Sequence, residues 1–182
     1  MKRLIGLITT VFVINTVPVF AQDYKIGDHG PAGGLIFYVD PAEEKVLPDG
    51  ITYLEAAPVD TANKSLWSNV LDKILNTKQE IGQGKANTQA IVTQEGHEYS
   101  AAKLCEDLNF NTFDDWFLPS LVELYLMYAN LKVGGYDAFA ANFYWSSSDV
   151  FEDGAFYINF SNGNTENYHK DNKYSVRCVR AF

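Results

Sequence analysis

The first apolar segments of the chain alternate with turn residues and predict strands. Residues 35–39 (Leu-Ile-Phe-Tyr-Val) are apolar throughout and follow a Gly/Pro-rich turn at 27–34, which predicts a strand buried on both faces. Residues 51–56 follow the turn Pro-Asp-Gly at 48–50 and predict a second strand. The segment 60–84 is polar and irregular, so we expect a long loop with a short helix around residues 70–75.

Apolar spacing of three and four residues then predicts helices. Residues 87–92 form a short apolar run, and a second run at 99–108 gives one buried face. The next helix has a defined start, because Ser120 can cap it and Glu123 completes a capping box three residues later. Its apolar positions continue to Leu131, and the two glycines at 134–135 end it.

The last third of the chain predicts short strands at residues 143–147, 155–160 and 174–181. Asn/Gly-rich connections at 152–154 and 161–164 separate them. Helices in the middle and antiparallel strands at the end indicate an α+β fold. The expected core residues are Trp116, Leu118, Leu124, Met127, Phe143 and Val179.

The first 21 residues are typical of a signal peptide. Lys2 and Arg3 precede an apolar stretch, and Ala21 ends a segment with small or aliphatic residues at the usual positions before a cut. A membrane anchor is the alternative, but Asn15, Thr16 and Pro18 interrupt the stretch and leave it short of the ~20 apolar residues that span a bilayer. We therefore expect a secreted, periplasmic or cell-surface protein, with one domain at 22–182 and no stable membrane insertion after cleavage.

The charge of the chain disfavours polyanionic partners. Removal of residues 1–21 takes away Lys2 and Arg3 but no acid, so the formal net charge changes from −9 to −11. A strongly acidic domain repels nucleic acid, and it repels sulfated sugars that bind through a broad basic surface.

The two cysteines, Cys105 and Cys178, lie on a predicted helix and in the final predicted strand. In an exported chain an even number of cysteines favours a disulfide, and two buried free thiols are the alternative. Glu106 and Asp107 next to Cys105 would raise the pKa of its thiol, which argues against a catalytic cysteine.

Sequence motifs for catalysis or metal binding are weak. The segment 82–88 resembles a phosphate-binding loop, but Gln79 and Ala86 stand where that loop needs Gly and Ser or Thr, so a helix N-terminal turn is favoured. The histidines show no metal-ligand spacing, and no cofactor is expected. Loop carboxylates would suit calcium, although a solvated acidic rim is the favoured interpretation; they are Asp114, Asp115, Asp149, Glu152 and Asp153.

One segment, from Tyr144 to Tyr174, concentrates amide, hydroxyl and aromatic side chains. Such side chains give adaptable hydrogen bonds and rigid contact area, as ligand-contacting loops do, although an ordinary polar sheet edge has the same composition. The candidate ligand-binding residues are Trp145, Asp149, Glu152, Asp153, Asn159, Asn164, Asn167, Tyr168 and His169.

Five blocks, taken in order, resemble the bacterial family named after the C-terminal domain of a collagen-like Legionella adhesin. They lie at residues 24–34, 84–88, 115–120, 144–148 and 176–182, and include Trp-Phe-Leu-Pro-Ser at 116–120 and Val-Arg-Cys-Val-Arg at 176–180. The family is similar in fold to C-type-lectin-like domains and formylglycine-generating enzymes. This resemblance implies a bridge from a helix to the last strand, which fits Cys105 and Cys178, and a ligand face on the loops before the final strands.

Two departures from that superfold limit the function it implies. The chain has no cysteines beyond the expected structural pair, so the reactive cysteine pair of the enzymes is absent, and it lacks the Glu-Pro-Asn and Trp-Asn-Asp signatures of calcium-dependent lectins. We expect a non-catalytic binding or adhesion module for a glycan or a host or cell-surface protein. The alternatives are a hydrolase or other enzyme on the same scaffold, since fold does not exclude chemistry, and a structural envelope protein.

Overall fold

The computed structural model describes residues 22–136 and 139–182, so the predicted signal peptide at 1–21 lies outside the described residues. The strands are β1 (Leu35–Val39), β2 (Tyr53–Ala56), β3 (Ala62–Ser65), β4 (Phe143–Val150), β5 (Gly154–Asn159), β6 (Asn164–His169), β7 (Tyr174–Val176) and β8 (Val179–Ala181). The helices are α1 (Gly84–Val92), α2 (Ala101–Glu106), α3 (Leu121–Met127) and the π-helical η1 (Tyr128–Val133), which continues α3.

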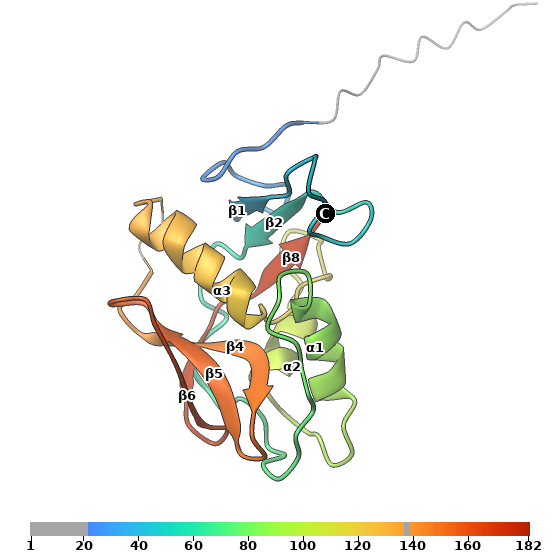
Figure 1. The fold of residues 1–182 in the computed structure, drawn as a ribbon, viewed down its shortest axis with the longest axis vertical. Coiled ribbons are helices and arrows are strands. Elements are labelled where there is room, and N and C mark those ends of the chain that lie inside the picture. Colours follow the sequence, from blue (N-terminus) through green and yellow to red (C-terminus); the bar gives the residue numbers. More distant parts are fainter. Residues whose placement is uncertain (1–21, 137–138) are drawn as a thin grey trace, which may run out of the picture.

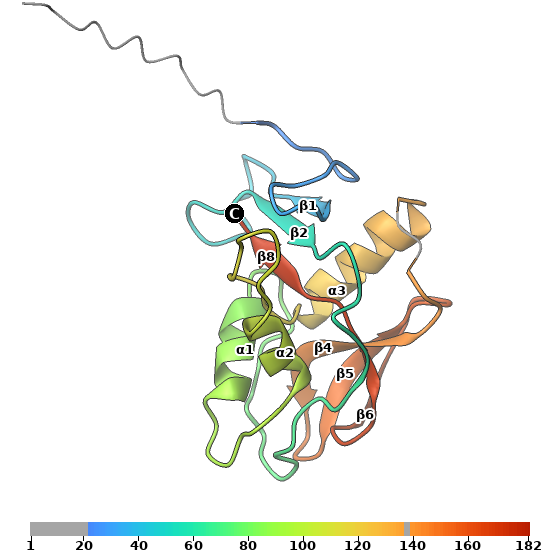
Figure 2. The same ribbon diagram turned by 180° about the vertical axis from the view of Figure 1, so that it is seen from behind.

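The strands form two sheets, which confirms the α+β class. The small sheet has the order β1-β2-β8, and the large sheet has the order β3-β7-β4-β5-β6 with β4 and β7 parallel. Helix α3 contacts β1 of the small sheet and β4 and β5 of the large one (Figure 1). Seen from behind, α1 and α2 lie on the opposite side of the molecule from the β5–β6 hairpin (Figure 2).

Most of the expected core is confirmed. Trp116, Leu118, Leu124, Met127 and Val179 are all at most 3 % exposed. The prediction for Phe143 is wrong, because it begins β4 with its ring 42 % exposed, although the ring contacts Tyr157 and Tyr174.

The helix predictions hold where local signals specify them. The capping box of Ser120 and Glu123 is formed, and the α3–η1 helix ends before Gly134. The segment 82–88 turns into α1, as expected. The predicted helix at 70–75 is wrong: the backbone N–H groups of Leu75 and Thr77 donate to the Asp149 carboxylate, and this contact with a distant strand holds the segment in an irregular conformation.

Three features of the sheets differ from the prediction. Strand β3 forms where a polar loop was expected, β6 forms where no strand was predicted, and the segment 174–181 is two strands instead of one. The break falls at Arg177 and Cys178, where β7 leaves the large sheet and β8 enters the small one. At this break the Arg177 guanidinium donates to Asp60 at 2.7 Å and to the carbonyl of Ala57 at 2.9 Å.

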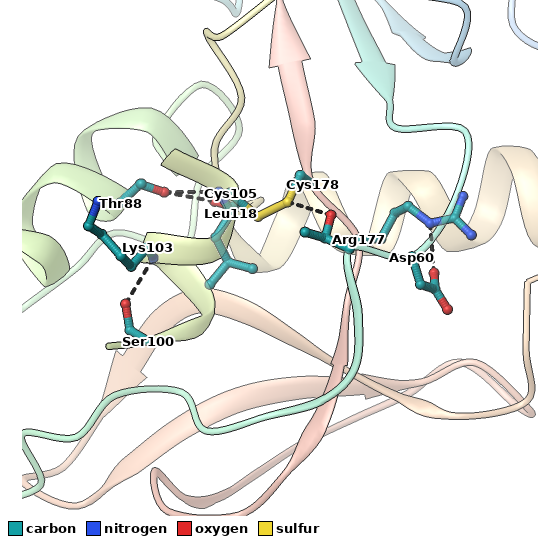
Figure 3. The surroundings of a disulfide bond; sticks show 9 residues. Asp60, Thr88, Ser100, Lys103, Cys105, Leu118, Arg177 and Cys178 are labelled. Carbon is teal, nitrogen blue, oxygen red and sulfur yellow. Dashed lines mark hydrogen bonds and ion pairs between the residues drawn. A yellow bond between two sulfur atoms is a disulfide. The ribbon is translucent and has the colours of Figure 1, made fainter. Parts of the chain in front are cut away.

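The disulfide between Cys105 and Cys178 is formed, and the alternative of two free thiols is wrong. It joins α2 to the crossing between β7 and β8, beside the Asp60–Arg177 ion pair (Figure 3). Within the described residues, no helix has the length and apolar character needed to cross a membrane.

Candidate ligand-binding face

Trp145 was predicted to contact ligand, and this is wrong because its side chain is fully buried. Its indole N–H donates to the carbonyl of Ser65 at 2.9 Å, and its ring packs against Tyr157 and Tyr174. The residue lies on β4 opposite Tyr157 of β5, in the covered middle of the large sheet. It is therefore a core residue.

Asp149 was also predicted to contact ligand, and it too is buried, with 6 % of its surface exposed. Its carboxylate accepts hydrogen bonds from the backbone N–H groups of Leu75 and Thr77 and from the Thr77 hydroxyl, at 2.6–2.9 Å. It also pairs with the Lys170 ammonium at 3.8 Å. Asp149 thus holds the segment 75–77 against the end of β4.

Lys170 is the buried partner of Asp149 at this end of the sheet. Its ammonium donates to the carbonyl oxygens of Lys73 and Glu152 at 2.7 and 2.8 Å and lies 4.9 Å from the centre of the Trp67 ring. Burial lowers the pKa of Lys170, and the nearby Asp149 carboxylate opposes that shift. Three segments that are distant in sequence, around residues 73, 152 and 170, are therefore joined at one point.

Above this buried pair, the turn between β4 and β5 meets the end of β6 at the surface. Here the structure brings together five of the predicted residues: Glu152, Asp153, Asn167, Tyr168 and His169. We call these five residues, together with Phe151 and Leu71, the hairpin face. Two adjoining hollows of about 110 and 190 Å³ open on it; Asp153 and His169 line both. The His169 ring nitrogen Nδ1 lies 2.8 Å from an Asp153 carboxylate oxygen.

Sequence reasoning missed the apolar part of the hairpin face. Phe151 is 67 % exposed, and Leu71 and Tyr168 are exposed beside it. Phe151 has φ +56°, in the left-handed region that a bulky residue rarely adopts. The sequence feature that could have revealed this part of the face is an aromatic residue, Phe151, in a turn that is otherwise acidic.

The predicted residues Asn159 and Asn164 do not belong to the hairpin face. They pair with each other at the far end of the β5–β6 hairpin, about 17 Å along β6 from His169 at 3.4 Å per residue. The Asn159 side chain accepts hydrogen bonds from the backbone N–H and the hydroxyl of Ser161. Asn159 therefore stabilises the turn.

The carboxylates proposed for calcium do not form a calcium site. Among the described residues, no three His, Cys, Asp or Glu side chains lie close enough together to hold a metal ion. Asp149 is paired with the Lys170 ammonium, Asp153 with His169 and Asp115 with Arg180. The Lys170 ammonium and the Arg180 guanidinium thus take the place of a hard cation at Asp149 and Asp115, and the His169 ring contacts Asp153.

Comparison with known families agrees with the motifs read from the sequence. The Lcl C-terminal domain family matches residues 57–180. The chain belongs to this family. The matched residues of this Lcl C-terminal domain contain both cysteines, the Asp149–Lys170 pair and the whole hairpin face. A search of curated proteins found no match to the chain.

Proposed function

We propose that this Lcl C-terminal domain is a non-catalytic binding or adhesion module that recognises a glycan or a surface protein through its hairpin face. The observation that carries the proposal is the pair of exposed rings, Phe151 and Tyr168, held above a buried ion pair. Because Asp149 and Lys170 fix the strands and the turn beneath, the backbone that carries the rings is held in place before ligand arrives. Binding then costs little backbone conformational entropy.

The chemistry of the hairpin face suits recognition. Tyr168 and Phe151 offer rigid area for stacking, while Asn167 and the Asp153–His169 pair offer hydrogen-bond donors and acceptors. Exposed carboxylates of Glu152, Asp153 and Asp171 give it an acidic rim. A neutral or basic ligand therefore fits it better than a polyanion.

The alternative of an enzyme on this scaffold finds less support. His169 and Asp153 are the one ring–carboxylate pair at the hairpin face that could transfer a proton, and both side chains are about 60 % exposed. Catalytic groups usually act where water is excluded and a nucleophile lies within hydrogen-bond reach. No hydroxyl or thiol among the described residues hydrogen-bonds to the His169 ring.

An exported location accords with this function. The disulfide between Cys105 and Cys178 persists in oxidising compartments and is uncommon in the cytosol. It supports the proposal that the domain acts in the periplasm, at the cell surface or outside the cell.

The test is binding of residues 22–182 to a glycan array and to immobilised host-surface proteins, repeated with variants of the two exposed rings. Tyr168→Ala and Phe151→Ala should each weaken binding at least about tenfold, as truncation of an aromatic contact residue does. Tyr99→Ala is the matched control, since Tyr99 is 53 % exposed against 50 % for Tyr168 and lies before α2. Equal loss of binding in Tyr99→Ala, or none in either ring variant, would contradict the proposal.

A further inference from the structure

Strand β6 forms the outer edge of the large sheet. It is last in the strand order, and all six of its residues are exposed. On its inner side it pairs with β5 in an unbroken antiparallel register of six residue pairs. Its outer side meets no strand among the described residues.

The ladder shows which backbone groups face outward. The Lys170 N–H donates to the carbonyl of Asp153, immediately beyond the paired residues. Because antiparallel pairs alternate between bonded and non-bonded, the N–H and C=O groups of Thr165, Asn167 and His169 point away from β5. The His169 carbonyl accepts from Asn172, and the other outward groups have no backbone partner among the described residues.

Natural sheets protect such edges, and β6 has only one of the usual devices, the charged side chain of Glu166, whose carboxylate accepts from the Tyr157 hydroxyl of β5. It contains no proline, lysine or glycine, it has no bulge, and it is six residues long. An edge of this length with so little protection is a template for another strand. From Thr165 to His169 the outward groups span about 14 Å, enough for four or five residues of a second chain.

The surroundings of the edge define the chemistry of that chain. Glu166 is exposed on β6 itself, and Glu152, Asp153 and Asp171 are exposed beside it. His169, the only basic side chain in the strand, is paired with Asp153. The hollows that Phe151 and Leu71 help to line adjoin the His169 end. Basic side chains would meet the carboxylates, and apolar ones would enter the hollows.

We propose that a partner protein binds by adding an extended segment with alternating basic and apolar residues to the outer edge of β6. This inference rests on the proposed function, because the hairpin face lies at the end of the same strand, and it narrows the ligand to a polypeptide. Backbone hydrogen bonds supply affinity, and the alternate side chains supply specificity. A second copy of this chain is a poorer occupant, because it would place two acidic rims together.

The test compares two substitutions at one position with a synthetic octapeptide that alternates lysine and valine. Thr165→Pro removes an outward N–H and leaves the inner ladder intact, since edge strands tolerate proline on the solvent side. Thr165→Ala shortens the same side chain but keeps the N–H, and Thr165 lies outside the hairpin face. Titration calorimetry should show binding to the wild type and to Thr165→Ala, and at least about tenfold weaker binding to Thr165→Pro.

The peptide provides a second test that does not depend on the folding of a variant. The same octapeptide with N-methyl groups on alternate residues cannot donate to the edge and should bind at least about tenfold more weakly, as should a glutamate–valine octapeptide. Equal binding to Thr165→Pro and Thr165→Ala would overturn the proposal. The proposal would also be overturned if the basic peptide did not bind at about 1 mM, a concentration at which even weak association is detected.

Two outcomes separate this proposal from the function on which it rests. If Tyr168→Ala abolishes binding to a glycan while Thr165→Pro does not, the hairpin face binds ligand and the added strand is wrong. If the protein alone sediments as a dimer that Thr165→Pro dissociates, a second copy occupies the edge and the proposed partner is wrong.

Discussion

Buried charged side chains in this domain have specific partners that connect distant segments. The Glu55 carboxylate accepts from the backbone of Ala32 and Gly34 and from Arg180. The Glu123 carboxylate accepts from the backbone N–H groups of Ser120, Gly82 and Gly84, at 2.7–3.4 Å. No buried side-chain nitrogen or oxygen of the described residues lacks a hydrogen-bond partner. These residues fix loops that have little apolar surface of their own.

Glu123 gives a prediction about pH. Burial raises the pKa of Glu123 from 4.5 to about 7, and its backbone hydrogen bonds limit the rise. Between these values the folded protein keeps a proton that the unfolded chain has released, so the free energy of unfolding falls as pH rises through this window, by about 3 kcal/mol. Urea unfolding from pH 4 to 8 should show this fall in the wild type and not in Glu123→Gln. Parallel profiles for the two proteins would refute it.

Trp116 gives a prediction about stability. Its ring is 3 % exposed, and its indole N–H donates to the carbonyl of Phe113. Trp116→Ala should lower the free energy of unfolding by about 3–5 kcal/mol, since truncation leaves a cavity. Urea unfolding measures the loss, and Trp116→Phe should recover part of it. A stable Trp116→Ala protein that loses only ligand binding would show that the ring serves recognition.

At the scale of elements, local sequence signals were sufficient where an element is buried or capped. The apolar run at 35–39 predicts a strand, and the capping box of Ser120 and Glu123 predicts the start of a helix. Strand β1 and helix α3 form at these places. Strand β6 has all six side chains exposed, so it has no alternation of apolar and polar residues to detect. It forms because β5 offers a ladder beside it.

Contacts between segments far apart in sequence account for the errors in the predicted site. Composition marked Asp149 and Trp145 as polar or aromatic residues of a candidate loop, but their partners, Thr77 and Ser65, lie 72 and 80 residues earlier. Phe151 escaped notice because apolar residues are expected inside. The stretch from Glu152 to His169 could be predicted as a candidate face from its composition. Which of its residues form the hairpin face, the turn at Asn159 or the outer edge of the sheet could be seen only from the register of β5 and β6.

The pairing of β1 with β2 depends on a close approach at Gly34. A Cβ atom at this position would lie 1.9 Å from the carbonyl oxygen of Ala56, which is backbone and cannot move aside. Gly34→Ala should therefore destabilise the domain by about 3 kcal/mol, the upper end for overpacking. Gly50→Ala is the control, because its Cβ would meet no atom within 4 Å and only its positive φ is strained, at about 1 kcal/mol. Thermal unfolding of the two variants tests the difference, and equal melting temperatures would contradict it.

At the scale of the whole molecule, the two sheets are joined by α3 and by the crossing from β7 to β8. The disulfide lies at this crossing and ties it to α2, while the hairpin face lies at the β5–β6 side of the large sheet (Figures 1 and 3). The covalent link and the ligand face are thus on different parts of the fold. Stability and binding should be separable by mutation.

The disulfide provides the test of that separation. It closes a loop of 73 residues, so replacing both cysteines with alanine should lower the free energy of unfolding by about 2–5 kcal/mol, chiefly through the greater freedom of the unfolded chain. Mass spectrometry of non-reduced peptides from the exported protein should find residues 105 and 178 linked, and urea unfolding measures the loss. Where the variant remains folded, its affinity for any ligand of the hairpin face should equal that of the wild type, because Asp149 and Lys170 hold that face independently of the bridge. Unlinked peptides from oxidised material would refute the bridge, and a folded variant with weakened binding would show that the crossing and the hairpin face are coupled.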